Sequence, residues 1–113
     1  MAKIELNGTG NFSNIVDVIV NETQKRGLTC ELKDSQTVQF EDTSIAMLVF
    51  EKYFWRNKSR ASLSVLVVAK DQTIKVTAIS SGGSLGVFLN ISWGAENAFV
   101  KMISEIIEPY GFH

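Results

Sequence analysis

The sequence has few of the residues that cross-link or stiffen a small protein, since its 113 residues include one cysteine, one proline and one histidine. A lone Cys30 cannot form a disulfide within the chain. Cys30 and His113 together are too few for the set of Cys and His ligands that holds a structural zinc ion. We therefore predict no disulfide, no metal site and no cofactor.

The chain also lacks a strong charge and a long apolar run. Its 11 basic and 12 acidic residues leave a net charge of −1, which does not predict a nucleic-acid or polybasic membrane surface. The longest apolar stretch, residues 63–69, is interrupted by Ser64 and is far shorter than the roughly 20 residues of a membrane span. The first eight residues alternate in polarity, unlike a secretory signal. We expect no membrane partner, no nucleic-acid partner and a cytoplasmic location.

Groups suited to catalysis are equally scarce. Cys30 sits at an inward position of an alternating segment with no histidine near it in the sequence, which is typical of a buried structural cysteine. The only histidine is the C-terminal residue, and no two carboxylates are spaced for acid–base work. The sequence favours a protein without enzymatic activity, although an enzyme remains a third hypothesis.

The length suits one domain covering residues 1–113, because a second core would have almost nothing to bury. Residues 3–6 alternate in polarity and predict a short strand, and residues 11–26 carry apolar side chains at helical spacing. Asn11 or Ser13 can accept a backbone N–H at the start of this helix, and Gly27 can close its end. Its many β-branched residues lower its intrinsic stability, so it must pack on a sheet.

The middle of the chain has the two-residue period of strands. We predict a strand at residues 28–32 that resumes at residues 38–40, and further strands at residues 45–55, 61–69, 73–80 and 87–93, with polar turns between them. Residues 45–55 are apolar enough for a strand covered on both faces, with Met47 as a core residue, or for a buried helical turn. Gly94 then allows a turn into a final helix, which Pro109 ends.

This order predicts an α+β fold, β-α-β(4-5)-α, with an antiparallel sheet of five or six strands and two helices on one face. The element order resembles a helix-grip fold, in which a curved sheet wraps a C-terminal helix. A ferredoxin-like or TATA-binding-protein-like two-layer sandwich is the alternative.

Two segments are candidates for a binding site. Residues 51–60 contain three consecutive aromatic residues followed by cations, which could stack a ring and hold an anion, or could form a strand end and a solvated loop. Residues 80–86 are rich in glycine without matching a phosphate-binding motif, so they suit a flexible or bulged connection or a loop that covers a ligand. The candidate ligand-binding residues are Tyr53, Trp55, Arg56, Arg60, Gly82, Gly83, Gly86 and Trp93.

Two stretches carry a resemblance to a known family. They are residues 50–54 with 59–63, and residues 81–83 with 86–88 and 93–96. In this order they resemble a family of small bacterial proteins catalogued as a domain of unknown function. The resemblance spans residues 49–99. It implies a cytoplasmic bacterial protein, and suggests that the arginine-rich and glycine-rich loops lie near each other.

Two functions remain open. The first is a non-enzymatic binding module for a small apolar or amphipathic ligand, with Tyr53, Trp55 and Arg60 at the mouth of a pocket of at least about 300 Å³ and residues 82–86 as its lid. The second is a homodimeric interaction protein without a small-molecule ligand, which uses residues 53–55 or residues 87–93 as its contact surface.

Overall fold

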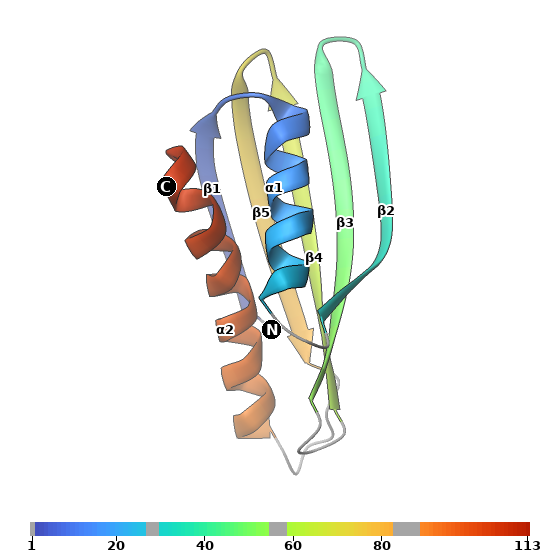
Figure 1. Ribbon diagram of the computed structural model, residues 1–113, viewed down its shortest axis with the longest axis vertical. Coiled ribbons are helices and arrows are strands. Elements are labelled where there is room, and N and C mark those ends of the chain that lie inside the picture. Colours follow the sequence, from blue (N-terminus) through green and yellow to red (C-terminus); the bar gives the residue numbers. More distant parts are fainter. Residues whose placement is uncertain (1, 27–29, 55–58, 83–88) are drawn as a thin grey trace.

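The computed structural model describes residues 2–26, 30–54, 59–82 and 89–113, and the side chains of residues 2–26, 30–53, 60–81 and 97–113. Five strands and two α-helices follow one another along the chain, as Figure 1 shows. They are β1 (Ala2–Thr9), α1 (Phe12–Lys25), β2 (Cys30–Phe40), β3 (Thr43–Phe54), β4 (Ser59–Lys70), β5 (Thr73–Gly82) and α2 (Leu89–Ile107), followed by the short 3₁₀ helix η2 (Glu108–Tyr110).

The strands form one antiparallel sheet in the order β1-β5-β4-β3-β2. Strands β2 to β5 are a meander in which each strand pairs with the next along the chain. Two-residue turns join β2 to β3 and β4 to β5, and Glu41 and Asp71 take positive φ angles of 56° and 57° there. Strand β1 pairs with β5, so β1 and β2 are the two edges of the sheet.

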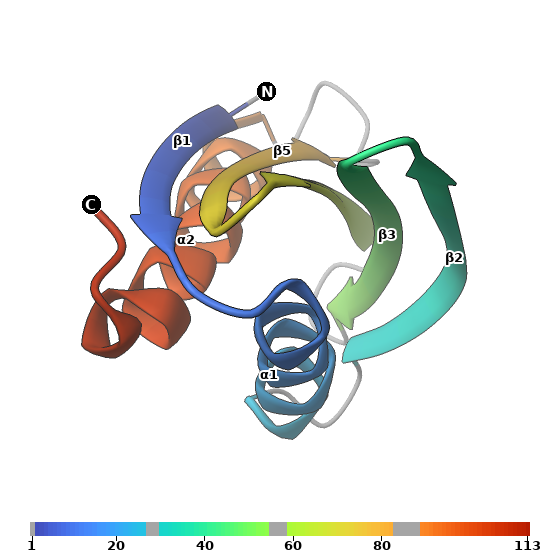
Figure 2. The same cartoon turned by 90° about the horizontal axis from the view of Figure 1, so that it is seen from above.

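Both helices cover the same, concave face of the curved sheet (Figure 2). Helix α1 packs against β2, β3 and β4, α2 packs against β1, β4 and β5, and the two helices contact each other. Alternate strand residues such as Leu48, Phe50, Leu63 and Val65 bury their side chains under the helices. This burial supplies the helix stability that the β-branched sequence of α1 lacks.

The ends of the helices follow from local chemistry. Asn11 caps α1, because its Oδ1 accepts the backbone N–H of Asn14 at 3.0 Å. Helix α2 ends at Ile107, two residues before Pro109, and the chain continues as η2.

The predicted α+β architecture is therefore confirmed, with five strands and with both helices on one face. Two details of the prediction are wrong. Residues 33–36 do not interrupt the strand, because β2 runs unbroken from Cys30 to Phe40 with an irregular register between Leu32 and Asp34. An edge strand tolerates such polar residues since one of its sides faces water.

The second correction concerns residues 87–93. Residues 89–93 belong to α2 and not to a sixth strand. Leu89 and Trp93 are four residues apart, a spacing that satisfies both the two-residue period of a strand and the 3.6-residue period of a helix. Gly94, which predicted a junction, lies inside the helix, where glycine is tolerated at a cost of about 1 kcal/mol. Residues 87 and 88 lie outside the described residues.

Candidate functional site

The convex face of the sheet, which the helices do not cover, carries an unusual number of apolar side chains. The strand register places Val38 beside Ile45 and Ile45 beside Val68 in one row across β2, β3 and β4. The next row along the strands contains Met47 beside Leu66. We call this set the outer apolar patch; its members are Val38, Phe40, Ile45, Met47, Val49, Leu66 and Val68.

Solvent reaches much of the outer apolar patch. Phe40 is 67% exposed, Val38 is 42% exposed and Met47 is 41% exposed. Met47 is therefore not the core residue that its sequence context predicted, and β3 is covered on one face only. A half-covered antiparallel strand usually alternates apolar and polar residues, so apolar residues on both faces of β3 and β4 indicate a surface that a partner can cover.

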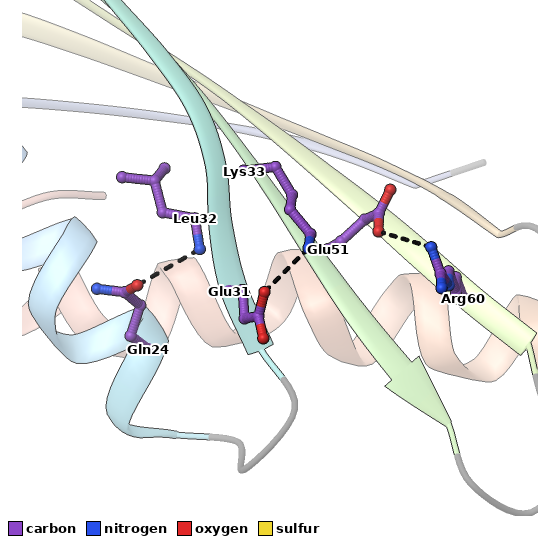
Figure 3. Close-up of polar contacts among 6 residues, drawn as sticks. All are labelled: Gln24, Glu31, Leu32, Lys33, Glu51 and Arg60. Carbon is purple, nitrogen blue, oxygen red and sulfur yellow. Dashed lines mark hydrogen bonds and ion pairs between the residues drawn. The ribbon is translucent and has the colours of Figure 1, made fainter.

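The same convex face becomes polar toward the other end of β2, β3 and β4 (Figure 3). Lys33 Nζ lies 2.9 Å from Glu31 Oε2, and Arg60 Nη1 lies 3.5 Å from Glu51 Oε1. The hydrogen bond from Lys33, together with its positive charge, lowers the pKa of Glu31. The two ion pairs are exposed, so each adds little to stability.

Two of the predicted binding residues meet at this polar end. Tyr53 and Arg60 are opposite each other on β3 and β4, and the Arg60 guanidinium carbon lies 5.9 Å from the centre of the Tyr53 ring. This is the distance of a cation–π contact. Arg60 thus bridges an aromatic ring and the Glu51 carboxylate on one exposed face.

Of the other predicted binding residues that the structure describes, Gly82 lies one strand away from this pair, because its partner Ala61 directly follows Arg60. Gly82 is the last residue of β5 and pairs with Ala61, and Trp93 lies within α2. Trp55, Arg56, Gly83 and Gly86 lie outside the described residues. The pocket that these residues were expected to line stays a prediction.

A shallow hollow lies elsewhere, beside the register irregularity of β2. It has a volume of about 120 Å³ and is lined by Asp34, Ser35, Gln36, Met47 and Val49. Pockets that enclose small ligands usually measure about 300 Å³ or more, so this hollow suits one protruding side chain rather than a whole ligand.

Cys30 is buried on the concave face, as its inward position predicted. Burial raises the pKa of its thiol, and the charge of Lys52 on the neighbouring strand opposes this shift in part. A protonated, buried thiol is a poor nucleophile, so the position supports a structural role. Within the described ranges, no three His, Cys, Asp or Glu side chains gather closely enough to hold a metal ion.

The two edge strands of the sheet, β1 and β2, differ in the groups that bond to their outer sides. The C-terminal residue pairs with β1, since His113 and Asn7 exchange backbone hydrogen bonds of 2.9 and 3.0 Å. On β2, Gln24 of α1 accepts the backbone N–H of Leu32 at 3.4 Å, next to the register irregularity (Figure 3). Beyond that point, residues 35–40 contain no charged residue and no proline, the features that usually discourage edge pairing.

The outer apolar patch was not predicted, although the sequence contains a signal for it. Residues 45–50 and 65–69 are apolar at consecutive positions and not only at alternate ones. In an antiparallel meander such a run predicts a second apolar face. The prediction that residues 45–55 are covered on both faces assumed that the domain itself also covers the convex face.

Among the described residues, no helix combines the length and the apolar character needed to cross a membrane.

The described structure is thus a small α+β domain whose five-stranded sheet has one face under helices and one open, partly apolar face. Residues 1–111 match the family model described as "Family of unknown function (DUF6054)". The chain belongs to this family, which confirms the resemblance to a domain of unknown function. No curated protein and no solved structure shows a significant match to the chain.

Proposed function

We propose that this domain is a non-enzymatic protein-interaction module whose contact surface is the outer apolar patch. The observation that carries the proposal is the exposure of Phe40, Val38 and Met47 around Ile45, on a face that neither α1 nor α2 covers. Apolar residues near the rim of a hollow suit a partner's side chain better than they suit water. A cytoplasmic location, as the sequence predicted, is part of this proposal.

A fluorescent dye with apolar rings and one sulfonate group, 1-anilinonaphthalene-8-sulfonate, tests whether the patch binds apolar groups in the folded protein. We expect the native protein to enhance the dye's fluorescence severalfold. The triple variant Val38→Thr/Phe40→Thr/Met47→Thr should lose most of this enhancement, because it removes the most exposed apolar side chains of the patch while keeping strand-forming residues.

The matched control changes three threonines on the same convex face but outside the patch, Thr9→Ser, Thr73→Ser and Thr77→Ser. It should bind the dye like the parent protein. Urea unfolding of both triple variants shows whether each is folded. Dye binding that is absent from the parent protein, or that persists in the folded patch variant, contradicts the proposal.

The second candidate is the small-ligand site at the polar end, which the stacking of Arg60 on Tyr53 supports. A planar anion could bind the guanidinium group from the side opposite the ring. Native mass spectrometry of freshly purified protein should then show a copurified small molecule that is absent from Arg60→Ala but present in Arg26→Ala, a control at another exposed arginine. An unliganded spectrum for the parent protein counts against this candidate.

A further inference from the structure

Residues 35–40 of β2 form an edge with which no other described strand pairs, beside the outer apolar patch. In a hairpin closed by a two-residue turn, the residues next to the turn bond to each other and every second residue points its backbone groups away from the partner strand. Phe40 and Thr43 flank the turn. The N–H and C=O groups of Thr37 and Gln39 and the C=O group of Ser35 therefore point to the free edge, whereas the N–H of Ser35 donates to Asp34 Oδ1 at 2.8 Å.

We propose that this edge pairs with the same edge of a second copy of the chain, with a two-fold axis through Thr37. The inference rests on the proposed function, because the second copy adds its own outer apolar patch to the contact surface. With this axis Ser35 lies opposite Gln39 of the partner copy and Thr37 lies opposite its own copy. All three outward-pointing residues then meet residues that point toward them, which is the condition for antiparallel hydrogen bonds.

Charge supports a second copy as the occupant. In this register each Lys33, which pairs with Glu31 in its own chain, also comes near Glu41 of the partner copy, so it lies between two carboxylates at each end of the paired segment. A shift of the axis by two residues toward Ser35 moves each Lys33 toward Thr37 of the partner copy. A shift by two residues toward Gln39 brings Glu41 toward Thr37. The register centred on Thr37 therefore pairs all outward-pointing residues and both charges.

The exposed apolar side chains also favour this arrangement. Val38 and Phe40 lie on the convex side of β2, at the margin of the outer apolar patch. Edge pairing places Val38 diagonally across from Val38 of the partner copy, within reach of side-chain contact. The outer apolar patches of the two copies then join into one continuous surface. Val38 and Phe40, which lie at the margin of the patch in a single chain, lie near the centre of this joint surface.

Analytical ultracentrifugation tests the pairing. We expect a dimer at tens of micromolar protein, and a monomer for Thr37→Pro, which removes an N–H that points away from β3 and therefore leaves the hairpin intact. Thr37→Ala retains the N–H and should remain a dimer. A parent protein that stays monomeric at several hundred micromolar, or a Thr37→Pro variant that still dimerises, overturns the inference.

Charge reversal gives an independent test at the ends of the segment. Lys33→Glu and Glu41→Lys should each weaken dimerisation severalfold at low salt, and the double variant should recover it, because each reversed charge again meets its opposite. Loss of dimerisation in the double variant equal to the combined loss in the single variants contradicts the register.

Disulfide trapping fixes the register in a Cys30→Ser background. Residues in a hydrogen-bonded antiparallel pair have Cα atoms about 5.5 Å apart, within the range of a disulfide. Thr37→Cys should form a covalent dimer under mild oxidation, whereas Ser35→Cys should form one only when mixed with Gln39→Cys. A Ser35→Cys homodimer as abundant as that of Thr37→Cys rejects the proposed axis.

These results separate the inference from the proposed function. The monomeric Thr37→Pro variant keeps the outer apolar patch, so it should still bind the apolar dye. Dye binding without dimerisation of the parent protein rejects the second copy alone, whereas loss of dye binding in all folded forms rejects the patch as a binding surface.

Discussion

The ring of Phe112 lies directly against Gly8, so closely that a Cβ atom added to Gly8 would come within 2.8 to 2.9 Å of three ring atoms. Phe112 is buried, and the neighbouring His113 pairs with Asn7 through its backbone. The C-terminal segment thus packs onto strand β1 and covers one edge of the sheet. This edge contrasts with residues 35–40 of β2, with whose outer side no other described strand pairs.

Gly8→Ala should therefore destabilise the fold. The added methyl group must displace the buried Phe112 ring, and overpacking of this kind costs about 1 to 3 kcal/mol. Urea unfolding measures the loss. In a Phe112→Leu background, where the ring is absent, the same substitution should cost less, so equal costs in the two backgrounds would show that the ring is not the cause.

Thr23→Val should raise the free energy of unfolding by about 1 kcal/mol. The Thr23 side chain is fully buried in α1, and its Oγ1 has no hydrogen-bond partner among the described residues. Replacing the hydroxyl with a methyl group of similar size removes the cost of an unsatisfied polar group. Thr23→Ser is the control, because it keeps the hydroxyl and loses the methyl group; it should destabilise. A Val variant less stable than the parent would contradict this assignment.

Removing the cap of α1 should weaken the domain by a smaller amount. Asn11→Ala abolishes the hydrogen bond from the Asn14 N–H and should cost about 1 kcal/mol. Asn11→Asp and Asn11→Ser both retain an acceptor oxygen and should unfold near the parent's urea midpoint. An Ala variant with the parent's midpoint would show that the cap adds nothing.

The buried thiol of Cys30 gives the unfolding free energy a dependence on alkaline pH. Burial raises the pKa of the folded-state thiol above its ordinary value, so the neutral form is favoured in the fold. This contribution to stability is complete below the pKa of the unfolded chain, about 8.5, and is lost as the pH rises through the higher folded-state pKa. The stability difference between the parent and Cys30→Ala should accordingly stay constant up to about pH 8 and shift against the parent above it. Native Cys30 should also react with iodoacetamide at least about tenfold more slowly than the urea-unfolded chain.

The sequence predicts the fold well where a single period is present. Residues 73–80 and the first half of residues 61–69 alternate clearly, and these segments form β5 and β4 with the predicted hairpin between them. Residues 89–93 could not be assigned in the same way, because a spacing of four residues fits a strand and a helix equally. Tertiary packing of the rest of α2 on β1 and β5 decides between the two.

The outer apolar patch was harder to predict than the core. Met47 and Leu66 have apolar side chains of the kind that usually lie in a core. The sequence does not say on which side of a sheet the helices lie. That side is fixed by contacts between distant segments, such as α1 with α2. The exposed apolar face can therefore be recognised only once the position of the helices on the sheet is known.

Backbone hydrogen exchange at the β2 edge, followed by NMR over a range of protein concentrations, tests the central claim most directly. The amides of Thr37 and Gln39 should exchange quickly in dilute protein and become several times slower as the concentration rises through the range of dimer formation. The amides of Gln36 and Val38, which point to β3, should stay protected throughout. Exchange at Thr37 and Gln39 that is equally fast at every concentration would contradict the account.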